Sequence, residues 1–296
     1  HNNLISNNTF TDISSAAIQI GGVSEADLRP DANSLVSSNQ IINNDISYTG
    51  RDYYDTAGIY VGFAAQTLIK NNSISHTPWS GIAIGWGWGL FDIDGFPGLP
   101  HANWNEWGSY STPTIMKNNQ IISNKISYFL EQLWDGGAIY ANGSQGNGYA
   151  DGLLLQLNVA QNKRGAAGSN IFYTDGGTQF ITLDLNVSLN NPVGYFDFGA
   201  CTPSTWPSIV SWANIRFCEI TPLRLPYGAE MGGCVSRGYI TYTNNYFTDP
   251  TTFYDVCTNY LAPGIPSTTP YIIKNNIQIS SAADVPSWII QQAGKQ

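Results

Sequence analysis

Residues 135–140 read Asp-Gly-Gly-Ala-Ile-Tyr, and related phrases recur along the chain. Other copies are 17–20 (Ala-Ile-Gln-Ile), 55–60 (Asp-Thr-Ala-Gly-Ile-Tyr) and 80–84 (Ser-Gly-Ile-Ala-Ile), with a weaker echo at 170–177. A β-rich phrase that returns every 20–30 residues or so is typical of a solenoid in which each repeat forms one coil. The repeat therefore predicts a parallel β-helix.

Short turns of the form Asn-X-apolar accompany these phrases. Asn tolerates the left-handed backbone conformation needed where strands bend at a corner, and its amide can stack on the Asn of the next coil. We expect corners of this kind at Asn8, Asn44, Asn72, Asn124, Asn186, Asn245 and Asn276.

The spacing of the repeated phrases indicates where loops interrupt the coils. Ile59 and Ile82 are 23 positions apart, the size of one undecorated coil. The interval from Ile18 to Ile59 is 41 positions and that from Ile82 to Ile139 is 57, so loops interrupt these coils or the second interval contains another coil.

Two insertions and a change of composition suggest the domain organisation. Residues 22–36 are predicted to form a polar surface loop, and 86–114 a long aromatic loop. Residues 1–198 are expected to form the β-helix coils. Residues 199–296 are expected to hold a Cys-containing irregular segment and the final coils of the same domain.

The composition supports an all-β class and excludes some classes of binding partner. The 296 residues are 42% apolar and only 11% charged, with a net charge of −9. Phosphate binding needs Lys and Arg, so the charge argues against nucleic acid or an anionic membrane as partner. No segment has the ~20 apolar residues of a membrane span. The Asn-rich start predicts further coils or other chains N-terminal to His1.

Cysteines and sequons suggest an extracellular, secreted glycoprotein. The even number of cysteines, without a CxxC pair, favours disulfides over zinc; three pairings are open, of which 201–218 with 234–257 is the most local. The residues concerned are Cys201, Cys218, Cys234 and Cys257, and the sequons start at Asn7, Asn71, Asn142 and Asn186.

Tryptophan is concentrated on and around the aromatic loop. Indole and phenol rings offer flat platforms for sugar rings, with polar neighbours to bind the hydroxyls. Trp79 and Trp134, directly before the repeated phrase, are alternatively core residues. The predicted substrate-binding residues are Trp86, Trp88, His101, Trp104, Glu106, Trp107 and Tyr140. His76 lies in a turn, where we expect a structural role through backbone hydrogen bonds.

Three carboxylates are the main catalytic candidates, and Asp92, Asp94 and Glu106 of the aromatic loop are the alternatives unless they are simply solvated. Asp55 and Asp135 occupy the same place in their phrases, and Asp175 follows its strand with a shifted phase. Hydrolysis of a glycosidic bond uses two carboxyl groups, which equivalent positions of a β-helix can supply. Simple Asp-Gly turns are the structural alternative.

Residues 75–89 and 133–140 also resemble stretches of extracellular right-handed parallel β-helix proteins of the glycoside-hydrolase-like, polysaccharide-acting type. The resemblance covers roughly residues 1–195 and implies catalytic carboxylates along one groove, which adds weight to Asp135 and Asp175. The motif set of polygalacturonases and the basic residues of pectate lyases are absent from the sequence. An acidic chain is poorly suited to an acidic polymer, so neutral glycans are favoured.

The sequence therefore predicts a secreted glycoside hydrolase, or hydrolase-like protein, acting on a neutral polysaccharide. The alternatives are a non-catalytic lectin or adhesin and an extracellular or cell-wall structural protein. No cofactor is predicted; Asp92 and Asp94 could contribute to a calcium site, although one Asp-x-Asp motif does not define it.

Overall fold

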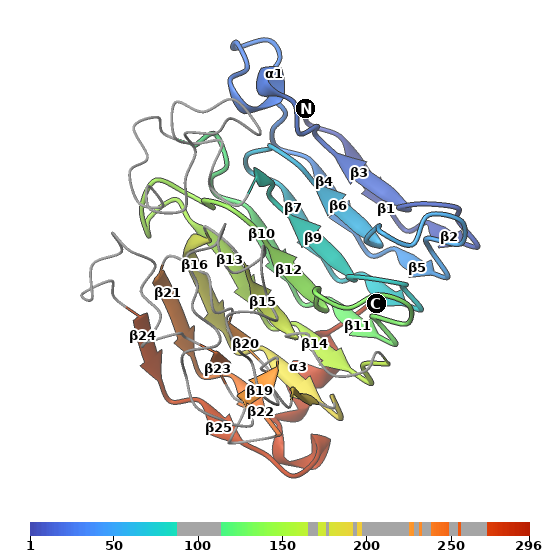
Figure 1. Ribbon diagram of the computed structural model, residues 1–296, viewed down its shortest axis with the longest axis vertical. Coiled ribbons are helices and arrows are strands. Elements are labelled where there is room, and N and C mark those ends of the chain that lie inside the picture. The colour runs from blue at the N-terminus through green and yellow to red at the C-terminus, as the bar shows by residue number, and fades with distance from the viewer. Residues whose placement is uncertain are drawn as a thin grey trace, which may run out of the picture.

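A computed structural model shows three parallel β-sheets that stack their strands along one axis (Figure 1). It describes residues 1–87, 114–164, 171–175, 178–191, 194–196, 225–227, 231–232, 238–248, 254–255 and 271–296. The order of strands in each sheet follows the chain in steps of one coil, as a β-helix requires. The predicted fold class is confirmed.

Within the part of the chain that the structure describes, sheets A and B each contain eight strands. Sheet A comprises β1 (Leu4–Ser6), β4 (Gln40–Ile42), β7 (Leu68–Lys70), β10 (Gln120–Ile122), β13 (Leu153–Gln156), β16 (Gln179–Asp184), β21 (Gly238–Thr243) and β24 (Tyr271–Lys274). Sheet B comprises β2 (Thr9–Thr11), β5 (Asp45–Ser47), β8 (Ser73–Ser75), β11 (Lys125–Ser127), β14 (Val159–Gln161), β17 (Val187–Leu189), β22 (Tyr246–Phe247) and β25 (Ile277–Gln278).

Sheet C contains the strands of the repeated phrase, β3 to β15 in the sheet order, and has seven strands among the described residues. They are β3 (Ile18–Ile20), β6 (Ile59–Val61), β9 (Ile82–Ile84), β12 (Ile139–Ala141), β15 (Phe172–Thr174), β20 (Met231–Gly232) and β23 (Tyr254–Asp255). The described ranges also include an antiparallel pair, β18 (Gly194–Phe196) and β19 (Leu225–Tyr227), and the short helices α1 (Glu25–Leu28), η3 (Ala282–Asp284) and α3 (Ser287–Gln292).

Pairing between strands explains the irregular spacing of the phrases. Strand β9 pairs directly with β12, with Ile82 opposite Ile139, so the 57-position interval is one coil with a long insertion. Beyond residue 198, strands β21, β22, β24 and β25 continue sheets A and B. The four cysteines lie outside the described residues.

The core consists mainly of aliphatic side chains from all three sheets, with a few aromatic rings such as Phe129 and Phe172. Ile41, Ile69 and Ile121 stack in register in sheet A, and each has none of its surface exposed. Burying one such side chain contributes about 1.5–3 kcal/mol, so stacking identical residues in each coil stabilises the column.

A ladder of asparagines links the coils at the corner between sheets A and B. Asn72 donates from both its backbone N–H and its Nδ2 to Asn124 Oδ1, each at 2.9 Å. Asn124 repeats both bonds to Asn158 Oδ1 at 3.0 Å. The ladder runs through Asn8, Asn44, Asn72, Asn124, Asn158, Asn186, Asn245 and Asn276.

The expected stacking of asparagines is confirmed, but the left-handed residue is the one before each ladder Asn. Asn71, before Asn72, has φ of 54°, and the same place in other coils is held by Leu157 (φ 59°) and Leu185 (φ 56°). The ladder Asn instead turns inward, because its side chain satisfies backbone groups of neighbouring coils. Asn158 belongs to the ladder although no Asn-X-apolar turn was predicted there.

Candidate functional site

Aromatic side chains gather on the outer face of sheet C. In the three-residue strands of this sheet, β3, β6, β9, β12 and β15, the flanking residues are buried in the core, whereas the middle residue faces outward. The middle residues Tyr60, Ala83, Tyr140 and Tyr173 lie in register on four successive strands. The Tyr140 ring packs against Trp79 (centroids 5.0 Å apart) and edge-to-face against Tyr173 (5.3 Å).

Two tyrosines and two aspartates form crossed hydrogen bonds on this face. Tyr140 of β12 donates from its hydroxyl to Asp175 Oδ2, 2.5 Å away, just beyond the end of β15. Tyr173 of β15 donates to Asp135 Oδ1, 3.1 Å away, in the turn before β12. Each strand thus binds the carboxylate that its neighbour's flanking turn supplies, and the pair of coils is tied together twice. We call Asp135, Tyr140, Tyr173 and Asp175 the crossed cluster.

The Asp-Gly-Gly turn places Asp135 at the surface. Asp135 adopts a left-handed conformation (φ 59°), and its backbone carbonyl accepts a hydrogen bond from Trp79 Nε1 at 3.1 Å. A side chain at Gly136 would meet Trp79 Nε1 at 2.4 Å and Ser80 Oγ at 2.7 Å. Only glycine fits there, so the turn holds Asp135 against the edge of Trp79.

The electrostatics of Asp135 suit a proton donor. The residue is exposed, yet the surrounding protein displaces enough water to raise the pKa of its carboxyl group, and the Tyr173 hydrogen bond opposes that rise. A carboxyl group with a raised pKa keeps its proton closer to neutral pH. This is the property a general acid needs.

Asp175 has a different environment. It is only 7% exposed. Its partner Tyr140 also receives a hydrogen bond from Asn142 Nδ2, 2.8 Å from the hydroxyl oxygen. Burial, followed by the negative charge of Asp175, raises the pKa of Tyr140 well above its ordinary value. Burial and the charges of Asp175 and Asp135 do the same to Tyr173, so both phenols stay protonated and serve as donors.

The structure brings together some of the predicted residues. Asp135, Asp175 and Tyr140 lie in the crossed cluster, while Asp55 precedes β6, two strands from β12, or about 10 Å along the stack. The exposed side chain of Asp55 makes no hydrogen bond or ion pair within the described part of the chain.

The tryptophans around the aromatic loop divide between packing and exposure. Trp134, next to Asp135, is 58% exposed, so the core alternative is wrong for this residue. Trp79 packs on Tyr140, and Trp86 is 37% exposed. The remaining predicted loop residues lie outside the described residues: Trp88, Asp92, Asp94, His101, Trp104, Glu106 and Trp107.

Tyr173 and Asn142 also belong to the site, although neither is among the catalytic or substrate-binding residues predicted from the sequence. Tyr173 could have been found, because it holds the same place after the phrase's apolar residue as Tyr140 does. The sequence predicts Asn142 only as a glycosylation site. Its side chain is 3% exposed and bound to Tyr140.

The asparagines of the other predicted glycosylation sites differ in how far they are buried. Asn186 is fully buried in the ladder, and Asn71 donates to the backbone carbonyl of Gln292. A glycan on Asn142 or Asn186 would require local unfolding, whereas Asn7 is exposed and stays a predicted glycosylation site.

His76 contacts neighbouring coils through its backbone, whose N–H donates to the Ser127 carbonyl at 3.3 Å, and also through its side chain. Its ring stacks between Tyr48 (4.3 Å) and Tyr128 (4.8 Å), and Nδ1 lies 2.9 Å from Glu131 Oε1. Arg164 covers the Tyr128 ring at 4.7 Å. This stack follows the ends of the sheet B strands and is separate from the crossed cluster.

The residues described above also bear on metal binding and on a membrane span. Within those ranges, no group of three or more His, Cys, Asp or Glu is arranged to hold a metal ion. No helix among them is both long and apolar enough to cross a membrane.

Comparison with known proteins gives a structural match. A solved structure titled "Glycoside hydrolase" superposes on 98% of this chain with a TM-score of 0.56 and 17% sequence identity. This chain spans 35% of the length of that protein, and at this identity the likeness shows the fold alone. No protein-family model and no curated protein matches the chain.

Proposed function

We propose that the outer face of sheet C binds a neutral polysaccharide and that the crossed cluster hydrolyses it. The observation that carries this proposal is Asp135, an exposed carboxyl group with a raised pKa beside the exposed Trp134 indole. The match to a protein titled as a glycoside hydrolase supports it as an analogy of fold.

The two carboxylates would have different roles. Asp135 donates a proton to the leaving glycosidic oxygen, because its raised pKa keeps the acid form available. Asp175 is nearly buried and contacts the outer face through Tyr140. As water attacks the sugar, the Tyr140 oxygen takes a proton from that water while the phenolic proton passes to Asp175. Asp175 then acts as general base through the tyrosine.

Trp134 would provide the binding surface. More than half of its surface is open to solvent, and it directly precedes Asp135 in the chain. An indole in this position can stack against the C–H face of a sugar ring while the Asp135 carboxyl reaches its linkage oxygen. Net charge favours neutral polymers, and secretion remains part of the proposal.

Release of reducing ends from soluble β-glucan, xylan and galactomannan tests the activity. Asp135→Asn should lower kcat by a factor of about 10²–10⁴ with binding retained, because general acid catalysis contributes that much. Asp55→Asn is the matched control, since Asp55 has the same place in its phrase but lies outside the cluster. Full turnover by Asp135→Asn would remove Asp135 from the mechanism.

One observation favours a second candidate, a non-catalytic glycan-binding protein on the same face. The Asp175 carboxylate is already bound by Tyr140 and is 7% exposed, as expected for a group that fixes the aromatic surface. If the wild-type protein binds glycans without releasing reducing ends, and Trp134→Ala abolishes that binding, the lectin function replaces hydrolysis.

A further inference from the structure

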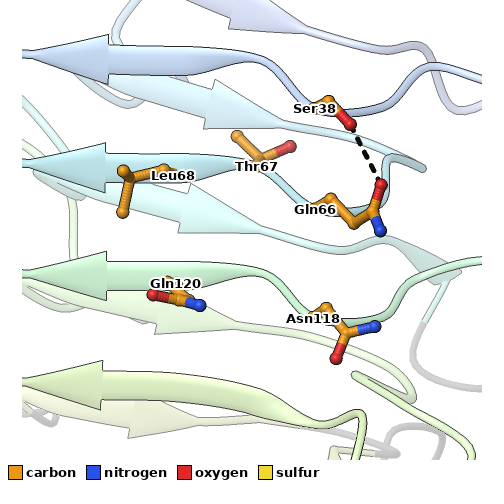
Figure 2. A pocket seen from close by; sticks show the side chains of 6 residues that line it. All are labelled: Ser38, Gln66, Thr67, Leu68, Asn118 and Gln120. Carbon is orange, nitrogen blue, oxygen red and sulfur yellow. Dashed lines mark hydrogen bonds between the residues drawn. The ribbon is translucent and has the colours of Figure 1, made fainter. Parts of the chain in front are cut away.

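A polar groove crosses three strands on the outer face of sheet A, which is a different sheet from the one that carries the crossed cluster. Its volume is about 360 Å³. Figure 2 shows the side chains that line it, and they come from the segments at β4, β7 and β10. The lining residues are Ser38, Gln66, Thr67, Leu68, Asn118 and Gln120.

The groove repeats one arrangement from coil to coil. Gln40, Leu68 and Gln120 lie opposite one another on β4, β7 and β10. Ser38, Gln66 and Asn118 are the residues two positions before them in the sequence. All three have left-handed backbones, with φ of 57°, 55° and 54°. Adjacent strands are about 4.8 Å apart, so the polar side chains form a row along the solenoid axis.

Most of the amide groups in this row are available to a ligand. Ser38 Oγ donates to Gln66 Oε1 at 3.0 Å, which leaves the Gln66 amide nitrogen without a bond inside the described ranges. The side chains of Asn118 and Gln120 are exposed and make no hydrogen bond with any described residue. Each amide offers two donors and one acceptor oxygen.

The floor of the groove contains a buried hydroxyl group without a partner. Thr67 is 1% exposed, and its Oγ1 makes no hydrogen bond among the described residues. Thr67 interrupts a second inner row of asparagines: Asn3 donates to Asn39 Oδ1, and Thr67 N–H donates to Asn119 Oδ1. Thr67 has no amide carbonyl with which to continue that row, so the groove lies where the row is broken.

The side chains that line the groove indicate which class of ligand it can bind. None of the six residues is charged, so the groove offers no ion pair to a phosphate, a uronate or an ammonium group. Amides and hydroxyls that both donate and accept match the hydroxyl groups of sugars, and Leu68 adds one apolar contact for a C–H face. We propose that this groove is a second, non-catalytic binding site for a neutral glycan chain running along the solenoid axis.

This site does not depend on hydrolysis at sheet C. A chain held on sheet A would keep the protein on an extended polymer whether or not the crossed cluster cleaves it. Binding at the groove and activity at Asp135 can therefore fail separately.

Affinity gel electrophoresis with soluble β-glucan, xylan and galactomannan tests the proposal, with polygalacturonate as the charged comparator. The double variant N118A/Q120A is made in a Trp134→Ala background, so that sheet C does not mask the result. We expect N118A/Q120A to weaken binding of at least one neutral polymer by about tenfold, the effect of losing two hydrogen bonds.

Gln40→Ala is the matched control. Gln40 is an exposed glutamine in the same register column as Gln120, but it does not line the groove, so binding should stay within about twofold. Glycan-induced shifts of the Gln66, Asn118 and Gln120 side-chain amide NMR signals provide a direct reading. Unchanged binding by N118A/Q120A, equal binding of polygalacturonate, or amide signals that no neutral glycan shifts would each overturn the proposal.

Discussion

The asparagine ladder and the crossed cluster both join coils through side chains, but they differ in regularity. In the ladder one residue type makes the same two bonds in coil after coil, as at Asn72 and Asn124. In the crossed cluster Tyr140 and Tyr173 bind different carboxylates on opposite flanks of two neighbouring strands. The ladder lies inside a corner, and the cluster lies on an outer face.

The comparison distinguishes the hydrogen bonds that stabilise the β-helix from those that place a reactive group at one point on its surface. A bond repeated identically in every coil stabilises the stack but marks no place along it. The crossed bonds, which among the described residues join two coils, place a particular carboxyl group at a particular point on the surface. We therefore expect ladder substitutions to act on stability and cluster substitutions to act on chemistry.

The largest effect is expected from Asn124→Ala in the middle of the ladder. The substitution removes the acceptor for both Asn72 donors and the donor to the Ile69 carbonyl, all in a fully buried corner. Unsatisfied buried groups cost about 1–3 kcal/mol each, so the free energy of unfolding should fall by about 3–5 kcal/mol. Equilibrium urea unfolding measures the loss.

Asn8→Ala is the control for this prediction. Asn8 stands at the exposed end of the described ladder and donates to Asn44 Oδ1. Its removal should cost about 0.5–1.5 kcal/mol. Equal losses at both positions would show that the interior of the ladder is not the main source of stability.

The ladder and the core columns could be predicted from sequence because the same residue type returns in each coil. The left-handed residue lies one position before the predicted one, and Leu157 and Leu185 take the conformation that Asn43 and Asn71 take in other coils. At this corner the ladder bonds of the following Asn fix the backbone, and residue preference is secondary.

The crossed cluster could be predicted only in part. The shifted phase of Asp175 was visible, and the structure places Asp175 after β15 and Asp135 before β12. The crossing itself depends on the directions in which Tyr140 and Tyr173 lean along their strands. A one-dimensional repeat carries no information on those side-chain directions.

A medium effect is expected from Tyr140→Phe, which tests whether the cluster is more than packing. The variant keeps the ring against Trp79 but removes the hydroxyl that joins Asp175 and Asn142. We expect a loss of about 1–3 kcal/mol in unfolding free energy. If Asp175 acts through this hydroxyl, kcat should fall at least about 100-fold in the reducing-end assay.

Tyr60→Phe serves as the comparison for that variant. Tyr60 has the same place on its strand, but its hydroxyl is 3.5 Å from the Gly85 carbonyl, too long for a strong hydrogen bond. Stability should change by no more than about 0.5 kcal/mol. Similar losses of unfolding free energy in the two variants would mean that the hydrogen bond from Tyr140 to Asp175 stabilises the protein no more than the Tyr60 contact does.

The smallest expected effect is a change in the pKa of Asp135 in the variant Tyr173→Phe. It tests the hydrogen bond between Tyr173 and Asp135. Burial raises the pKa of Asp135 above its ordinary value of 3.8, and the hydrogen bond from Tyr173 lowers it. Tyr173→Phe removes only the second influence, so the pKa of Asp135 should rise further. A carbon-detected NMR titration of the Asp135 carboxyl group measures the change directly. An unchanged or lower pKa in Tyr173→Phe would contradict the hydrogen bond.

The raised pKa of Asp135 also changes how the free energy of unfolding depends on pH. Between pH 3.8 and its raised folded-state pKa, Asp135 binds a proton more readily in the folded protein than in the unfolded chain. Its contribution to stability therefore improves as the pH falls through the folded pKa and is least favourable at neutral pH. Asp135→Asn removes this dependence, so its melting temperature relative to wild type should be highest near pH 7 and decline toward acid. A gap that widens toward acid would reverse the sign and would mean that the folded protein favours the Asp135 carboxylate over its acid form, which the general-acid role at sheet C does not allow.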